Sequence, residues 1–342
     1  MRKLLDYSLD ELKTLLEDTG EKPFRAKQVM QWLVQGKRFD EMTNLSLSLR
    51  RKLKGRYTEG YAEIVRVLAS KDGTKKYLFA FEDGCMVESV FMQKDYGNTI
   101  CVSTQVGCRM GCVFCASGAN GFVRNLTAGE ILAQVIAVNA DNGEGRAITN
   151  IVLMGMGEPL DNYDNVVKFL RLVNARDGLN IGMRNISLST CGLAGKIDRF
   201  AQEGLPVTLS ISLHAASDGK RAQVMPVANR YSLREIISAA NNYFLKSGRR
   251  IIIEYAVIDG FNDGTEDVEL LRELLLGLNC HVNLIPLNDN SGVALKAPAK
   301  RRVYAFCDML SKAGLSATVR KSMGSDIAGA CGQLKQQYQS EK

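Results

Sequence analysis

Three cysteines within eight residues form the part of this sequence best suited to chemistry. Cys108, Cys112 and Cys115 follow the spacing C-x3-C-x2-C in the segment GCRMGCVFC. Thiolates are the ligands that soft metals and iron–sulfur clusters prefer, and the two glycines of the segment allow the backbone to fold closely around such a group. A structural zinc site usually needs four ligands, and both histidines lie far away in the sequence. The pattern predicts an iron–sulfur site with one iron open for a small molecule; a chance cluster of structural cysteines is the alternative.

An alternation of β-branched and helical segments surrounds the triplet and would position it. From about residue 98 onward, about six such pairs follow one another. This alternation predicts a parallel sheet with a layer of helices, and six units favour a partial (β/α)6 barrel over a complete eight. The triplet directly follows the first strand, in the kind of loop that carries chemistry in barrel folds. The expected strands cover residues 99–104, 150–155, 185–190, 207–213, 250–258, 281–287 and 316–321.

A small helical domain is predicted to precede this α/β barrel. Residues 1–57 show amphipathic helical spacing and begin with a capping box at Ser8. Residues 58–95 alternate as strands around a hairpin turn and are expected to link the two domains. The barrel is assigned to residues 96–321, and the glycine-rich segment 322–342 is expected to form a mobile loop and tail.

The composition of the 342 residues is typical of a soluble protein in a reducing compartment. No apolar run approaches the ~20 residues that span a bilayer. Charges also occupy the N-terminal positions where a signal peptide is apolar. Nine unevenly spaced cysteines do not suggest a secreted disulfide framework. We therefore expect a cytoplasmic protein that is not bound to a membrane.

The formal net charge of +7 is compatible with nucleic-acid binding but does not establish it. One basic run is more informative, although solvated helix ends would explain it equally well. Together with shorter basic pairs, this run favours an RNA partner. It consists of Arg50, Arg51, Lys52, Lys54 and Arg56.

The triplet, with Phe114 before its last cysteine, resembles the signature of radical S-adenosylmethionine (radical SAM) enzymes. The wider sequence resembles one branch, the RNA adenine-C2 methyltransferases of the RlmN/Cfr type, over nearly the whole chain. The triplet alone would indicate only the superfamily, whereas its combination with Cys101 and Cys331 is specific to the branch. The segments that carry the resemblance are CVSTQVGCRMGCVFC, GFVRNLTAGEI, MGMGEP, SISLHA, LIPLN and ACGQL.

The resemblance implies a bound [4Fe-4S] cluster and SAM. Cys108, Cys112 and Cys115 would ligate the cluster, whose open iron would bind the amino and carboxylate groups of SAM. On residue type alone, the glycines of GMGE suit a tight turn and a serine at a strand end commonly caps a helix. A lone histidine is likewise more often structural than a ligand. The implied SAM contacts are Gly157, Glu158, Ser189, Ser212, Leu213, His214 and Asn288.

Two further cysteines would perform the unusual step that the resemblance implies. Cys331 would accept a methyl group from one SAM, and a radical made from a second SAM would activate it for attachment to adenine C2. Because C2 is electron-poor, a radical route is chemically sensible, and methyl carriage requires a nucleophilic thiol. Glu88 would accept the C2 proton, and a Cys101–Cys331 disulfide would release the base. On residue type alone, Cys101 suits a buried strand and Glu88 a solvent-facing strand position.

The resemblance also implies the partners of the protein. The substrates would be an adenine in the peptidyl-transferase region of 23S rRNA and the adenine 3′ of the anticodon in some tRNAs. The helical domain would dock RNA, a low-potential flavodoxin-like donor would supply electrons, and a thiol reductant would reset the enzyme. The protein is expected to be a monomer.

Other functions remain open at this stage. Methylation at adenine C8 uses the same motifs, and a non-catalytic zinc or iron–sulfur RNA-binding protein is a different class. A radical SAM enzyme acting on protein or metabolite would leave Cys101 and Cys331 unexplained. The other cysteines, expected to be packing residues, are Cys85, Cys191, Cys280 and Cys307.

Overall fold

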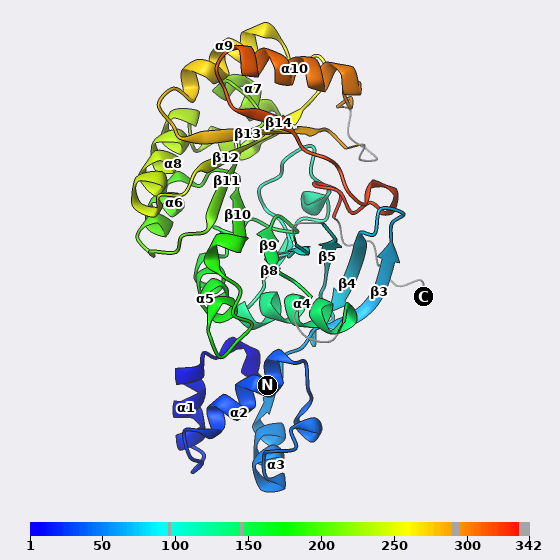
Figure 1. Ribbon diagram of the computed structural model, residues 1–342, viewed down its shortest axis with the longest axis vertical. Coiled ribbons are helices and arrows are strands. Elements are labelled where there is room, and N and C mark those ends of the chain that lie inside the picture. Colours follow the sequence, from blue (N-terminus) through cyan, green and yellow to red (C-terminus); the bar gives the residue numbers. More distant parts are fainter. Residues whose placement is uncertain (95–96, 144–146, 289–294, 335–342) are drawn as a thin grey trace.

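Figure 1 shows the computed structural model of the chain, which describes residues 1–94, 97–143, 147–288 and 295–334. A small helical bundle at one end packs against a larger body in which helices surround a curved sheet. None of the described helices is both long and apolar enough to cross a membrane.

Short helices with buried leucine faces form the N-terminal bundle. Its elements are β1 (Arg2–Lys3), α1 (Leu9–Glu17), α2 (Arg25–Val34), α3 (Leu47–Arg56) and β2 (Tyr57–Thr58). The expected capping box is present, because Ser8 and Glu11 accept hydrogen bonds from each other's backbone N–H groups. β1 pairs in parallel with β2, so the bundle closes on itself. Asp6 Oδ1 accepts a hydrogen bond from Gly129 N at 2.7 Å, which joins the bundle to α4 (Ala128–Asp141) of the larger body.

The larger body confirms the predicted partial barrel. Its parallel strands are β6 (Thr99–Cys101), β9 (Asn150–Leu153), β10 (Ile186–Thr190), β11 (Thr208–Ser212), β12 (Ile251–Val257), β13 (Cys280–Pro286) and β14 (Ala317–Val319). The intervening helices are α4, α5 (Tyr163–Asn174), α6 (Ala194–Ala201), α7 (Asp218–Val224), α8 (Leu233–Ser247), α9 (Thr265–Leu274) and α10 (Lys300–Lys312). Neighbouring strands pair in parallel in this order, which among the described elements gives six βα units followed by a seventh strand. Figure 1 shows the helices outside the curved sheet.

An antiparallel meander extends the same sheet beyond β6. It consists of β3 (Glu63–Ala69), β4 (Lys75–Ala80) and β5 (Met86–Met92). The expected hairpin turn is present, with Ser70 N bonded to Thr74 O at 2.8 Å. These strands were expected to link two domains, but the structure shows them as one edge of the main sheet, because Val90 of β5 pairs with Cys101 of β6. The meander therefore contributes to the barrel mouth.

A second small hairpin interrupts the first βα connection. The strand expected over 99–104 ends at Cys101, and the chain then forms β7 (Gln105–Gly107), which pairs with β8 (Phe122–Asn125). Strands this short carry too little alternation to be predicted from sequence. The hairpin brings together the two ends of the segment that carries the triplet.

Candidate functional site

The loop of the cysteine triplet is closed at its base by β7 and β8. Gly107 adopts a φ of +75°, and a Cβ at this position would lie 1.8 Å from Gly121 O. Only glycine fits such a close approach of two backbones. Cys108 N donates to Gly121 O at 3.2 Å, so the triplet begins where the hairpin ends.

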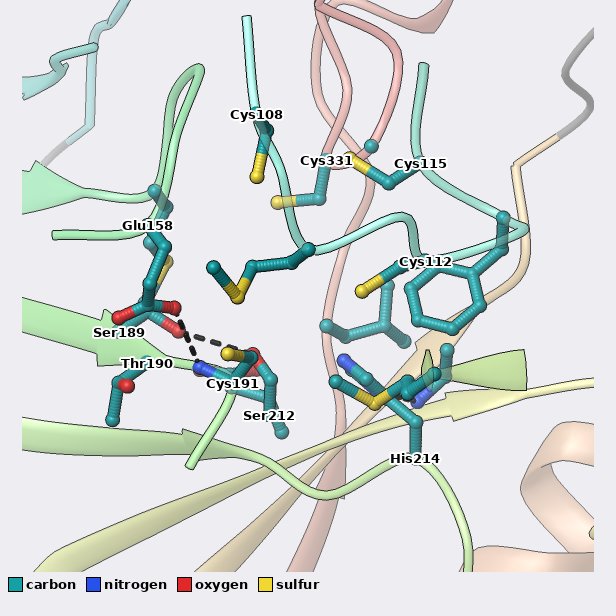
Figure 2. Close-up of a pocket in the computed structure, with 18 of the residues that line it drawn as sticks. Cys108, Cys112, Cys115, Glu158, Ser189, Thr190, Cys191, Ser212, His214 and Cys331 are labelled. Carbon is teal, nitrogen blue, oxygen red and sulfur yellow. Dashed lines mark hydrogen bonds between the residues drawn. The ribbon is translucent and has the colours of Figure 1, made fainter. Parts of the chain in front are cut away.

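The three thiols of the triplet line one pocket at the carboxyl ends of the barrel strands. Figure 2 shows their sulfur atoms on one side of this pocket, across from Ser189, Ser212 and Glu158. The loop is also held by the barrel, because Val113 N donates to Val224 O of α7 at 3.0 Å. Local chain and barrel together fix the direction of the thiols.

The chemistry of this donor set fits an iron–sulfur cluster. Burial raises the pKa of Cys108 to about 12 and raises the pKa of Cys112 and Cys115, so binding a metal group would release protons from these thiols. Over the described ranges, no three His, Cys, Asp or Glu side chains meet closely enough to hold a single ion. A four-iron cluster does not require such a meeting point, since each cysteine binds a different iron.

The same pocket collects most of the residues implied to contact SAM. Six of the seven line it, and Leu213 instead lies behind the wall with its side chain fully buried. Gly157 has a φ of +98°, and a Cβ there would lie 2.5 Å from Gln105 Cβ, so the tight turn expected on residue type alone is present. The residues that line the pocket are Gly157, Glu158, Ser189, Ser212, His214 and Asn288.

Glu158 organises this turn through its buried carboxylate. Its oxygens accept hydrogen bonds from Leu160 N at 3.0 Å and from Cys191 N at 2.8 Å, the second of which is drawn in Figure 2. Burial raises the pKa of the Glu158 carboxyl, and these hydrogen bonds oppose that shift. The carboxylate thus ties the end of β9 to the end of β10. Cys191, expected to be a packing residue, also lines the pocket.

His214 joins the triplet loop to the barrel. Its φ is +61°, and its Nδ1 accepts a hydrogen bond from Ala256 N at 2.9 Å. Burial lowers the pKa of His214 to about 3, so the ring is neutral and carries its proton on Nε2. Phe114 packs edge-on against this ring, with the ring centroids 4.9 Å apart. His214 therefore has a structural role and also forms part of the pocket wall.

Cys331 stands where two pockets meet. It lines the pocket of the triplet and also an adjoining pocket that is lined by Cys101. Both cysteines are free thiols, and burial, reinforced by the nearby Cys331, raises the pKa of Cys101 to about 12. Cys101 is buried in its strand, as its residue type suggested. It also shares the adjoining pocket with Cys331, the other cysteine implied to act in catalysis.

Glu88 is buried, so its interpretation as a solvent-facing strand residue is wrong. Its side chain is 5% exposed and forms an ion pair with Lys76 on the neighbouring strand, with Nζ 3.1 Å from Oε1. It shares one face of β5 with Val90 and Met92, which line the pocket of Cys101.

The segment that carries Cys331 is docked against the barrel mouth. Asn288 Nδ2 donates to Cys331 O at 3.0 Å, and Ala116 N of the triplet loop donates to Gly332 O at 2.7 Å. Ser117 Oγ donates to Leu334 O at 2.8 Å. The loop expected to be mobile is thus described in one well-bonded position up to residue 334, and the expected tail over 335–342 lies outside the described residues.

Two buried charged groups near the pocket were missed by sequence reasoning. Arg221 is fully buried, donates to Cys191 O and Leu213 O, and pairs with no carboxylate among the described residues. Glu254 lines the triplet pocket and lies 3.6 Å from Arg320, which lines both pockets. The apolar run around Glu254 in the strand expected over 250–258 could have indicated its burial. No such local pattern surrounds Arg221, which only the tertiary fold covers.

The basic run of the helical domain lies on α3 and is partly used inside the domain. Arg50 Nη1 donates to Asp40 O, and Lys52 and Lys54 form ion pairs with carboxylates of the same domain. Arg51 and Arg56 are exposed, and within the described part of the chain their side chains form no hydrogen bond or ion pair. These two side chains are therefore the ones available for a partner.

Two family models match this chain. The model of the "Radical SAM superfamily" matches residues 102–275, which include the triplet and most of the barrel. The model described as "Ribosomal RNA large subunit methyltransferase N-terminal domain" matches residues 2–58, which are the helical bundle.

Similar proteins and a similar solved structure cover the whole length of the chain. A "Probable dual-specificity RNA methyltransferase RlmN" from Clostridium perfringens is 52% identical over 100% of this chain and 99% of its own length. A protein of the same name from Clostridium acetobutylicum is 50% identical over the same shares. The crystal structure of a radical SAM methyltransferase from Sphaerobacter thermophilus is 43% identical, with a TM-score of 0.94, and covers 98% of this chain and 99% of that one.

Proposed function

This chain belongs to the radical SAM superfamily and, within it, to the RlmN-type RNA methyltransferases, and we propose that it methylates C2 of adenine. The proposed substrates are an adenine in the peptidyl-transferase region of 23S rRNA and the adenine 3′ of the anticodon in some tRNAs. The observation that carries the proposal is the position of Cys331, which lines both the pocket of the triplet and the pocket of Cys101. A thiol at this junction suits transfer of a carbon from a cofactor on one side to a base on the other.

The triplet of Cys108, Cys112 and Cys115 would hold a [4Fe-4S] cluster, and the opposite wall of the same pocket would hold SAM. When bound, the cluster and SAM would supply a methyl group from one SAM and, from a second SAM cleaved by one-electron reduction, the means to remove a hydrogen atom from that methyl group. Neutral His214 would offer Nε2–H as a donor, and the hydroxyls of Ser189 and Ser212, 3.3 Å apart, would serve as further polar contacts.

Cys331 would carry the methyl carbon as a thioether until it is joined to adenine C2. An adenine inside folded RNA must leave its stack to reach this site. Glu88 would take the proton from C2 as the base adduct gives up its unpaired electron. The Cys101 sulfur would then attack the Cys331 sulfur, the carbon–sulfur bond would break with its electron pair on carbon, and a proton would complete the methyl group. The resulting disulfide would be reduced by an external thiol. A low-potential flavodoxin-like donor would supply the electron for SAM cleavage, in the cytoplasm and with the protein as a monomer.

Labelled-SAM turnover with rRNA and tRNA, followed by mass spectrometry of the nucleosides, tests the function. We expect 2-methyladenosine, 5′-deoxyadenosine and a brown four-iron protein after anaerobic reconstitution. Methylation at C8 instead would contradict the assigned regiochemistry. A colourless zinc protein without SAM cleavage would favour the non-catalytic RNA-binding class.

Variants of the two catalytic cysteines test the route. Cys331→Ala should lose the methyl adduct on the purified protein and lower RNA methylation by at least about 10³-fold. Cys101→Ala should still attach carbon to RNA but stall as a protein–RNA crosslink at Cys331, detected by gel shift and mass spectrometry. Full turnover by either variant would contradict the methyl-cysteine route.

A further inference from the structure

Lys76 on β4 is buried between the carboxylate of Glu88 and the loop that carries Cys331. Its side chain is 5% exposed, its Nζ lies 3.1 Å from Glu88 Oε1, and it donates to Ala328 O at 3.2 Å. A single ammonium group therefore contacts both the proposed base and the backbone of the loop three residues before Cys331.

The same loop is bonded to the turn that precedes Lys76. Asp326 accepts hydrogen bonds from Ser70 Oγ at 2.6 Å and from Lys71 N at 3.3 Å, and Gly324 N donates to Asp72 Oδ2 at 3.0 Å. The β3–β4 turn thus anchors one end of the loop.

The buried Lys76–Glu88 ion pair adds little to the stability of the fold, which suggests that it has a functional role. Removing two charges from water carries a desolvation penalty that a close contact only partly repays, so apolar side chains would fill this strand face at least as favourably. On this face of β5, Glu88 lies between Met86 and Val90, and Val90 and Met92 line the neighbouring pocket together with Ala330 and Cys331. The loop lies against the Lys76 end of the pair, because Ala328 O accepts a hydrogen bond from Lys76 Nζ.

We propose that Lys76 is a positioning residue that couples the carboxylate of Glu88 to the docked position of the Cys331 loop. With the loop docked, Lys76 fixes the distance between proton acceptor and methyl carrier. When the loop moves to admit the RNA base, the Lys76 ammonium group loses its hydrogen bond to Ala328 O and keeps its ion pair with Glu88. This inference rests on the proposed function for the roles of Glu88 and Cys331, whereas the contacts of Lys76 do not depend on it.

Hydrogen exchange of the loop and single-turnover RNA methylation in Lys76→Met test the coupling. Without SAM or RNA, amide exchange over residues 323–334 should rise by about tenfold, because a buried charged hydrogen bond is lost. The rate constant for RNA methylation should fall while iron content and 5′-deoxyadenosine formation stay unchanged. Lys76→Arg, which keeps the charge and a donor, should restore part of both.

Lys75→Met is the matched control on the same strand. Lys75 pairs with Asp141 at 3.4 Å, away from the loop, so its removal should change neither loop exchange nor RNA methylation. Unchanged exchange in Lys76→Met, or an equal effect of Lys75→Met, would overturn the proposal. A folded state with normal iron content in Lys76→Met itself excludes global misfolding as the cause.

Asp326→Asn tests whether Lys76 couples Glu88 to the Cys331 loop or only anchors that loop. It weakens the loop at the β3–β4 turn but leaves Glu88 paired with Lys76, so exchange should rise while methylation falls less than in Lys76→Met. Equal losses of methylation would show that Lys76 acts only as an anchor. If wild-type protein did not methylate RNA, the proposed function would fail, but the exchange experiment would still decide whether Lys76 holds the loop.

Discussion

The triplet loop and the Cys331 loop bring thiols to the same pocket but are held by different kinds of contact. The triplet loop is closed at its base by the β7–β8 hairpin, whose strands lie next to it in the sequence, and a bond from Val113 N to Val224 O of α7 adds a distant support. The Cys331 loop depends on partners such as Ser70 and Lys76, which are 256 and 252 positions away from the residues they bond. A loop closed by its own neighbours suits a permanently bound group, whereas a loop held by distant contacts can be released without unfolding the barrel.

Removing one thiol from each loop should separate the roles of the two loops most clearly. Cys112→Ala should abolish cluster binding, and therefore 5′-deoxyadenosine formation should fall by at least about 10³-fold. Cys331→Ala should keep the cluster and SAM cleavage while losing the methyl adduct and RNA methylation. Iron analysis and the charge-transfer absorption of the cluster measure the difference. Loss of iron in both variants would contradict the division of roles.

A smaller effect is expected from the backbone of the triplet loop. Gly107→Ala would place a Cβ against Gly121 O, and the strained φ with this clash should cost roughly 2–5 kcal/mol and lower cluster occupancy. Gly121→Ala is the matched control, since its φ is +71° but no atom lies within 4 Å of the added Cβ. It should cost only about 1–2 kcal/mol. Thermal unfolding and iron content check both, and equal effects would mean that the close approach is unimportant.

The smallest effect concerns α3, far from either loop. Replacing Arg51 and Arg56 by Gln should weaken RNA binding and reduce the salt slope of the binding constant by about 2. SAM cleavage should be unchanged, because both side chains lie on the helical bundle. Arg272→Gln on α9, at the opposite end of the molecule in Figure 1, is the control. An unchanged RNA affinity and salt slope in the double variant would remove α3 from the RNA surface.

The regular parts of the fold could be predicted because their signals are local. Alternation of strand and helix segments placed every parallel strand of the barrel, and the capping box at Ser8 was read directly from residue types. The end of β6 at Cys101 and the β7–β8 hairpin were missed, since a strand of three residues has no measurable periodicity. The place of β3 to β5 in the main sheet was also missed, because strand pairing is a long-range choice.

The functional site likewise has features that the sequence predicts and features that only the tertiary structure shows. Spacing and residue type alone determined the triplet and its suitability for an iron–sulfur group, because three thiols within eight residues must share one loop. Only the tertiary structure decided that Glu88 is buried against Lys76, that Arg221 is fully buried, and that Cys331 lies between two pockets. Burial and charge pairing depend on which distant segments cover a residue, and no local pattern records that.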